Sequence, residues 1–263
     1  MSTGSSPRDG KLNLLLQEWP RGAVVTQRRL DELGVYRQLT SKYARYAWVE
    51  KIGTGAYVRA GDTVDWRGGL YALQAQVGMT AHVGAETALT YLGLAHFLPS
   101  GSRRRVILIS DEPEQLPVWF RHHRWDADLV HRCLALFDAI PDEASARLDC
   151  SGFHVVMSSA ERSIMEQIRL VQTNDEIDHA LELMSGLSTL RPHVVQELLE
   201  ACRSIKVKRL FLWAAETVGH QWFDRLDPRK IELGTGKRQL YKGGRLNTKY
   251  QITVPLGEEL PSV

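Results

Sequence analysis

Short apolar stripes separated by turn residues fill the first sixty positions of the chain. Residues 12–19 are mostly apolar and end at Pro20, which predicts a short first helix. The next helix is expected to begin after Thr26, whose hydroxyl can accept a free backbone N–H, and to continue through Leu33. Gly34 is expected to end it, because glycine adopts a positive φ at little cost. The pattern therefore predicts two short helices with a tight turn after the second.

A third helix and a β-hairpin follow. Residues 36–47 have helical periodicity, with Leu39, Tyr43 and Tyr46 predicted on the buried face. Residues 48–59 alternate as two strands do around a Gly-Thr-Gly turn. Helix, turn, helix and hairpin is the order of a winged helix-turn-helix, so we predict that fold for the N-terminal part of the chain.

The remainder of the chain mixes strand and helix patterns. Residues 64–98 are expected to be helical and to join the two halves, with a boundary at the Pro-Ser-Gly-Ser sequence of residues 99–102. Beyond it, strands are predicted at 106–109, 117–120, 153–157 and 250–254, and helices at 161–171, 176–187, 194–202 and 206–213. The expected fold class is α+β, with a winged helix-turn-helix domain and its helical extension at 11–98 and a mixed α/β domain at 99–263.

Composition and charge restrict the function classes. The 263 residues are 43% hydrophobic and 24% charged, which is ordinary for a folded globular protein and excludes disordered and collagen-like classes. The net charge of +2 hides a segregation, because residues 1–70 carry +4, residues 71–202 carry −8 and residues 203–250 carry +8. Two basic segments around an acidic one offer surfaces to polyanions, although charge that only solvates the surface is the simpler alternative.

The sequence indicates neither a membrane nor an oxidising compartment. It has no stretch of about 18 apolar residues, the length that a membrane-spanning helix needs. The N-terminus lacks the apolar core of a signal peptide, and the three cysteines form no CxxC pair. We therefore expect a cytoplasmic protein with free thiols.

The third helix carries the chemistry of a recognition helix, because its polar face has cations and an amide but no acid. A helix fits the major groove, where Arg binds guanine and Gln binds adenine in a bidentate manner, and cations also neutralise phosphates. The residues predicted to bind DNA are Arg28, Arg37, Gln38, Ser41, Lys42, Arg45, Lys51, Thr54 and Arg59. The alternative is that this basic face docks another protein.

Motifs in both halves of the chain resemble one protein family. In the N-terminal half they are Gly34–Val35, Trp48–Gly53, Gly55–Tyr57, Val64–Gly68, Leu70–Gln74 and Leu94–His96, and in the C-terminal half Ser159–Arg162, Arg191–Pro192, Lys206–Leu212, Gly219–Trp222 and Lys237–Pro255. Together they resemble the AbiEi family of antitoxins, which belong to type IV toxin–antitoxin systems linked to abortive phage infection. Ala47 departs from the family pattern, since relatives usually have glycine there.

The resemblance implies a bacterial antitoxin that is also a transcriptional autorepressor. Its N-terminal winged helix would bind repeats in double-stranded promoter DNA, and its C-terminal domain would counteract an AbiEii-like nucleotidyltransferase toxin without forming a stable complex with it. The most distinctive C-terminal motifs suggest Glu161 and Arg162, together with the basic run of Lys206, Lys208 and Arg209, as toxin-neutralising residues. These three cations are expected to stay solvated while the apolar residues that follow are buried.

Catalytic patterns are weak by comparison. Residues 234–237, Gly-Thr-Gly-Lys, lack the spacing and the following Ser or Thr of a phosphate-binding loop. No metal and no cofactor is expected. A helical metal site typically places two histidines on one face of a helix, and no HxxxH or HExxH pair occurs among His122, His123, His131, Asp126 and Asp128. The chain is therefore predicted not to be an enzyme. Two alternatives stay open: a stand-alone winged-helix repressor whose C-terminal domain binds an effector, and an enzyme such as a nuclease.

Overall fold

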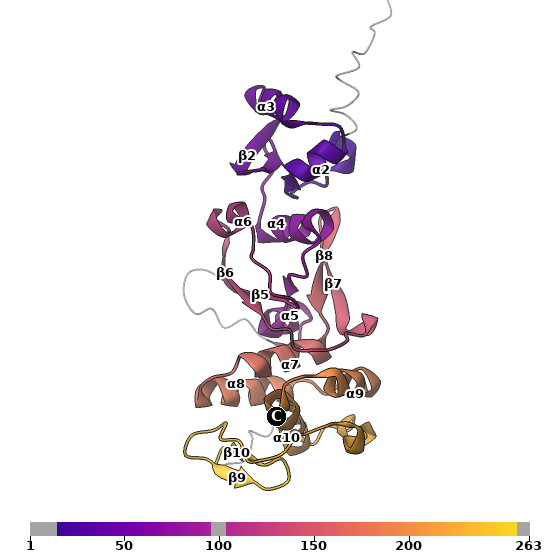
Figure 1. The fold of residues 1–263 in the computed structure, drawn as a ribbon, viewed down its shortest axis with the longest axis vertical. Coiled ribbons are helices and arrows are strands. Elements are labelled where there is room, and N and C mark those ends of the chain that lie inside the picture. The colour runs from indigo at the N-terminus through magenta and orange to yellow at the C-terminus, as the bar shows by residue number, and fades with distance from the viewer. Residues whose placement is uncertain (1–14, 96–103, 257–263) are drawn as a thin grey trace, which may run out of the picture.

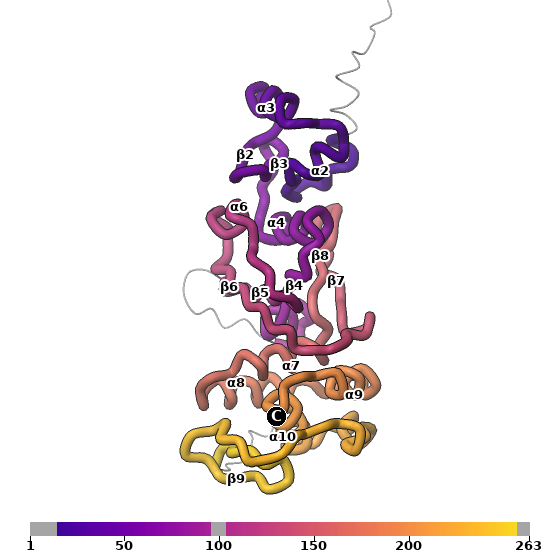
Figure 2. The backbone as a smooth tube through the Cα atoms, viewed as in Figure 1, coloured from indigo at the N-terminus to yellow at the C-terminus, as the bar shows by residue number. Residues whose placement is uncertain are grey.

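The molecule is built as three tiers stacked along its length (Figure 1). The computed structural model describes residues 15–95 and 104–256. Helices and strands of the first sixty residues form the N-terminal tier, a five-stranded sheet forms the middle tier, and helices with a two-stranded hairpin form the C-terminal tier. The backbone trace runs through these tiers in chain order (Figure 2).

The N-terminal tier is the predicted winged helix-turn-helix. The Thr26 hydroxyl accepts the backbone N–H of Arg29 at 3.2 Å and Gly34 has φ +75°, so both predicted signals of the second helix are confirmed. The three strands form an antiparallel sheet in the order β1-β3-β2. Residues 15–18 are helical, and the named elements are β1 (Val25–Thr26), α2 (Gln27–Glu32), α3 (Arg37–Arg45), β2 (Val49–Gly53) and β3 (Ala56–Arg59).

The buried face of α3 differs from the prediction at one position. Tyr43 is buried and Leu39 is half-buried, but Tyr46 is 62% exposed. Thr40 is buried instead, and its hydroxyl donates to the carbonyl of Val35 at 3.3 Å. The prediction for Tyr46 is wrong because α3 ends at Arg45, so the helical period no longer sets the direction of the next side chain.

The middle tier is a mixed sheet in the order β6-β5-β4-β8-β7. β5 and β6 are parallel, as are β4 and β8, while β4–β5 and β7–β8 are antiparallel. The strands are β4 (His82–Val83), β5 (Arg104–Ser110), β6 (Ala127–Cys133), β7 (Ser145–Cys150) and β8 (Phe153–Ser158). The helices are α4 (Trp66–Ala72) with a π-helical turn (Leu73–Val77), α5 (Ala85–Tyr91), α6 (Val118–His122) and a 3-10 turn (Asp142–Ala144).

Two expectations for this tier are wrong. Residues 117–120 begin α6 instead of a strand, because the Pro117 carbonyl accepts the N–H groups of Phe120 and Arg121 and closes a helical turn. The segment before residue 98 is not only helical, since β4 lies between β5 and β8 at the centre of the sheet. A division between residues 98 and 99 would cut this sheet in two. The expected linker at 99–102 lies outside the described residues.

The C-terminal tier contains the four helices that the sequence predicts, with shifted ends. Hydroxyls of Ser159, Thr173 and Ser204 cap three of them, and Pro192 stands in the first turn of the fourth. The elements are α7 (Ala160–Leu170), α8 (Asn174–Ser185), α9 (Pro192–Ala201), α10 (Ile205–Val218), two 3-10 turns (Phe223–Arg225 and Pro228–Lys230), β9 (Arg245–Asn247) and β10 (Ile252–Val254). Among the described helices, none is both long and apolar enough to cross a membrane.

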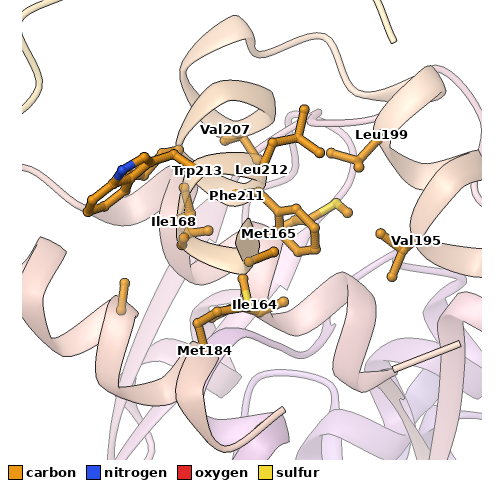
Figure 3. Packing of buried hydrophobic residues seen from close by; sticks show 14 of the residues in the cluster. Ile164, Met165, Ile168, Met184, Val195, Leu199, Val207, Phe211, Leu212 and Trp213 are labelled. Carbon is orange, nitrogen blue, oxygen red and sulfur yellow. The ribbon is translucent and has the colours of Figure 1, made fainter. Parts of the chain in front are cut away.

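Two hydrophobic cores join the tiers. The larger fills the C-terminal tier, where side chains such as Met165, Met184 and Phe211 converge from three helices (Figure 3), and it includes Leu89 of the middle tier. The second extends from the N-terminal sheet into the middle tier, so that Val58 belongs to the same apolar cluster as Val106. The winged helix-turn-helix therefore shares buried surface with the middle tier.

Ala47, at the turn between α3 and the hairpin, adopts a left-handed backbone with φ +53°. Glycine accepts this conformation readily, whereas the Cβ of any other residue crowds the following carbonyl. The chain enters the wing through this strained turn, because β2 begins two residues later.

We expect Ala47→Gly to raise the free energy of unfolding by about 0.5–1 kcal/mol. The left-handed region costs alanine roughly 1–2 kcal/mol, and the greater freedom of glycine in the unfolded chain offsets part of the gain. Ala44→Gly, three residues earlier in α3, is the matched control and should destabilise by about 1 kcal/mol. Urea denaturation measures both, and equal destabilisation by the two changes would contradict the strain at Ala47.

Candidate functional site

The polar face of α3 is exposed and positively charged. Arg37, Gln38, Ser41, Lys42 and Arg45 are all exposed, and the helix contains no acid. In the described part of the chain, its three cations make no salt bridge with an acidic side chain. The Lys42 ammonium lies 5.9 Å from the centre of the Tyr46 ring. These groups are therefore available to an anion such as the DNA backbone.

A buried amide holds α3 at its angle to α2. Gln27 is 7% exposed, and its Nε2 donates to the Asp31 carboxylate at 2.9 Å, to the Val35 carbonyl at 3.2 Å and to the Thr40 hydroxyl at 3.3 Å. One side chain thus links α2, the turn and α3. The sequence analysis missed Gln27, which follows the N-cap and has no polar partner at a helical spacing other than Asp31.

Arg28 differs from the cations of α3. Its side chain is 70% exposed, but its Nε lies 3.4 Å from Glu32, and the neighbouring Arg29 contacts both Glu18 and Glu32. The surface of α2 is therefore nearly neutral. Exposed pairs of this kind contribute about 0–1 kcal/mol, so a phosphate could still displace Glu32.

The predicted residues of the wing have unequal environments. Lys51 and Thr54 are exposed, but Arg59 is half-buried, and burial lowers its pKa while Asp62 opposes that shift. The end of β2 packs against α6, since a Cβ added at Gly53 would lie 2.6 Å from the Cβ of Trp119. The wing is consequently fixed against the middle tier at this point.

Three exposed aromatic side chains flank α3, and the sequence analysis did not select them for this surface. Tyr36 is 59% exposed at its N-terminal end, while Tyr46 at 62% and Trp48 at 48% follow its C-terminal end. Tyr and Trp are enriched at interaction surfaces, where the ring is covered and its polar atom finds a hydrogen-bond partner. In the sequence, Tyr36 and Trp48 lie outside the apolar positions predicted to be buried in the third helix, and this position could have indicated that they are exposed.

The residues predicted to face the toxin are mostly buried. Glu161 is 3% exposed and accepts hydrogen bonds from the Arg191 guanidinium at 2.8 and 2.9 Å and from the Arg191 N–H at 3.0 Å. Burial raises the pKa of Glu161, but these Arg191 hydrogen bonds outweigh it and lower the pKa to about 2. Glu161 therefore ties α7 to the start of α9.

Arg162 belongs to a second buried network, centred on Glu166. The Arg162 guanidinium contacts Glu166 at 2.8 Å and Asp111 at 2.5 Å, and it lies 2.9 Å from His82 Nε2. Glu166 also accepts hydrogen bonds from the Ser158 hydroxyl at 2.9 Å. Burial raises the pKa of Glu166, but the Arg162 charge and His82 prevail and lower it to about 2.

The expectation that Lys206, Lys208 and Arg209 stay solvated is wrong. Lys208 is 4% exposed, Arg209 is 2% exposed, and the half-buried Lys206 ammonium donates to the Val171 carbonyl. The Arg209 guanidinium donates to the carbonyls of Leu233, Gly234, Gly236 and Gln251 at 2.6–3.3 Å. Arg209 thus organises the loop before the C-terminal hairpin, in which the carbonyls of Gly234 and Gly236 accept hydrogen bonds from its guanidinium.

The histidines weighed as a metal cluster have separate partners. His131 Nε2 lies 2.8 Å from the Ser110 hydroxyl, and the His123 ring packs edge-on against Trp125 with 4.3 Å between ring centres. Among the described residues, no group of three or more His, Cys, Asp or Glu side chains could hold a metal ion.

The comparisons with known proteins agree with this architecture. A family model described as a transcriptional regulator, AbiEi antitoxin N-terminal domain, matches residues 8–100, and one described as a transcriptional regulator, AbiEi antitoxin, type IV TA system, matches residues 103–255. The crystal structure of the RV2827C protein from Mycobacterium tuberculosis has a similar fold, with a TM-score of 0.52 and 14% identity over 94% of this chain and 91% of that chain. No curated protein matches.

Stability should fall as the pH drops from about 4.5 to about 2, because the pKa values of Glu161 and Glu166 are near 2 in the folded chain and near 4.5 as reference values. A lowered folded pKa stabilises the protein above the unfolded pKa, and protonation removes that stabilisation. For Glu166 the effect is on the order of 3 kcal/mol.

Urea denaturation between pH 6 and pH 2 measures this dependence. Glu166→Gln should lower stability at pH 6, because the buried Arg162 loses one of its two carboxylates and keeps only Asp111, and should flatten the pH profile. Glu197→Gln is the control, because Glu197 is an exposed residue of α9 that forms no salt bridge within the described residues. A profile of equal slope in Glu166→Gln and the unaltered chain would contradict the assignment.

Proposed function

The chain belongs to the AbiEi antitoxin family, the transcriptional regulators of type IV toxin–antitoxin systems, and we propose that it represses its own promoter and counteracts a nucleotidyltransferase-like toxin. The observation that carries the DNA-binding part is the exposed face of α3. That face presents Arg37, Lys42 and Arg45 without an acid and without a salt bridge among the described residues.

In this proposal α3 enters the major groove of double-stranded promoter DNA. Arg37 and Gln38 lie in the first turn of α3, where the side chains of a recognition helix reach base edges. Lys42 and Arg45 lie in the last turn and neutralise phosphates, and the exposed Lys51 and Thr54 of the wing contact the DNA backbone as well. Repeated half-sites would let two copies bind one operator, since protein symmetry matches operator symmetry.

The toxin-facing surface is proposed within the same basic segment that the sequence singles out, on its exposed cations. Lys206, Lys208 and Arg209 support the fold of this segment, as do Glu161 and Arg162 in α7. Four cations around the C-terminal hairpin are exposed and have no salt bridge within the described residues: Lys237, Arg238, Lys242 and Arg245. A cationic surface can engage an acidic partner transiently, because charge complementarity raises the encounter rate even where the complex is weak.

A second candidate function is supported by one observation. A polar cleft of about 230 Å³ lies where the N-terminal and middle tiers meet, lined by Arg21, Arg67 and Asp149 among others. An effector bound there would contact both tiers, as a stand-alone ligand-responsive repressor requires. A toxin gene directly beside this one would favour the antitoxin, and its absence would favour the effector-responsive repressor.

Affinity for promoter DNA should fall steeply with salt, with a log–log slope of about −0.9 for each phosphate contacted. Arg45→Ala should weaken binding to all sequences alike, while Arg37→Ala should cost about 1–3 kcal/mol and relax specificity at one base pair. Fluorescence anisotropy on promoter and scrambled duplexes separates the two effects. Arg225→Ala, an exposed cation of the C-terminal tier, is the control. Binding that does not change with salt would refute an electrostatic interface.

Protection from the toxin should depend on the exposed hairpin cations. Lys237→Glu, Arg238→Glu and Arg245→Glu together should abolish growth rescue in cells that produce the toxin, with little change in thermal midpoint, because surface substitutions usually stay within about 0.5 kcal/mol. Arg132→Glu, Arg147→Glu and Arg169→Glu reverse as many exposed charges elsewhere and serve as the control. Full rescue by the hairpin variant would place the neutralising surface elsewhere.

A further inference from the structure

A second group of exposed cations lies beside the wing, on the middle tier. Residues 121–124, Arg-His-His-Arg, end α6 and continue into the loop before β6, and Arg121, His122 and Arg124 are exposed. Figure 1 shows α6 next to β2, at the junction of the N-terminal and middle tiers. From the sequence alone, the histidines of this run suggested only metal ligands.

Two contacts attach this segment to β2. The close approach of Gly53 to Trp119 leaves no room for a side chain on the wing strand, since an added Cβ would lie 2.6 Å from the Trp119 Cβ and 3.0 Å from its Cα. One turn later, burial lowers the pKa of the His123 ring while the neighbouring backbone of Ile52 opposes that shift, which places the ring against β2. Lys51, the exposed cation of the wing, is adjacent in sequence to Ile52.

The segment also packs against the core of the middle tier. The Trp125 indole N–H donates to the Phe120 carbonyl at 2.8 Å, and the two rings pack with their centres 5.2 Å apart. Both rings lie against Gly69 of α4, where an added Cβ would meet them at 2.7–2.8 Å. The backbone that carries Arg121 and Arg124 is therefore held between β2 and the core of the middle tier.

The cations of this segment are free to meet an external anion. Arg121 Nε donates to the Leu116 carbonyl at 3.0 Å, which leaves its terminal nitrogens to the solvent. Neither Arg121 nor Arg124 forms a salt bridge with any acid of the described ranges 15–95 and 104–256. The acid on the wing strand, Glu50, accepts the N–H of Gly61 at 3.2 Å.

We propose that Arg121 and Arg124 contact the DNA phosphates next to those bound by the wing, so that the DNA interface extends onto the middle tier. This inference rests on the proposed DNA-binding function. Phosphate contacts of this kind position a protein on the duplex without reading its sequence. The middle tier would thereby fix the angle at which the whole elongated molecule leaves the DNA.

The test uses the full-length chain with Arg121→Ala and Arg124→Ala, and anisotropy on the promoter duplex over a range of salt concentrations. Loss of two phosphate contacts should reduce the magnitude of the log–log salt slope by nearly 2, and affinity for promoter and scrambled duplexes should fall by the same factor. The control is Arg225→Ala with Lys230→Ala, which removes the same charge from exposed positions of the C-terminal tier and should leave the slope unchanged.

The outcomes separate the two levels of the proposal. If the unaltered chain binds DNA and the Arg121/Arg124 variant has the same salt slope, the extension onto the middle tier is refuted while α3 keeps its role. If the unaltered chain does not bind DNA, the proposed function itself fails. An equal change of slope in the control would assign the effect to net charge and would likewise refute a local contact. Circular dichroism of each variant establishes that it is folded.

Discussion

The buried carboxylate of Glu166 connects the sheet to the helical end of the molecule. It lies on α7 and is bound by groups from α5, β4 and β8, namely the Ala85 N–H at 3.0 Å, His82 at 3.1 Å and the Ser158 hydroxyl at 2.9 Å. A buried charge is costly unless it is paired and fully hydrogen-bonded, and Arg162 provides the counter-charge. Gly84 belongs to the same arrangement, because an added Cβ there would lie 2.6 Å from the Glu166 Oε2.

Within the described residues, the N-terminal tier is joined to the middle tier by close approaches between backbones instead of by buried ion pairs. A Cβ at Gly68 would lie 1.9 Å from the Gly22 carbonyl oxygen, and the Val24 N–H donates to the Gly68 carbonyl at 3.1 Å. Gly53 meets α6 in a similar way. A winged helix-turn-helix held at these points packs directly against the middle tier, with which it shares an apolar cluster.

The two basic segments of the chain have different uses in the fold. In the N-terminal segment the cations of α3 remain on the surface. In the C-terminal segment the Arg209 guanidinium donates its hydrogen bonds to backbone carbonyls, and Lys208 is buried. Charge counted along the sequence therefore overstates the cationic surface of the C-terminal tier. The cations that remain exposed there include Lys237 and Arg245 near the β9–β10 hairpin and Arg225 and Lys230 in the two 3-10 turns.

Local signals in the sequence determined most of the secondary structure and the winged helix-turn-helix. Thr26 and Gly34 delimit α2, and Ser159 and Pro192 mark the starts of α7 and α9, because caps and turns depend only on neighbouring residues. The exposed cations of α3 follow from the same local pattern, since a short amphipathic helix has one buried face.

Only the tertiary structure decided which charged residues are buried and where the sheet begins. β4 has two residues, too few for a periodic pattern, and it becomes a central strand because β5 and β8 pair with it. Arg162 and Arg209 resemble surface cations in sequence. Besides Glu166, one helical turn away, Arg162 binds Asp111, which is 51 residues away, and Arg209 binds carbonyls from Leu233 to Gln251, which are at least 24 residues away. Burial of a charge depends on such distant partners, which no local pattern of residues reveals.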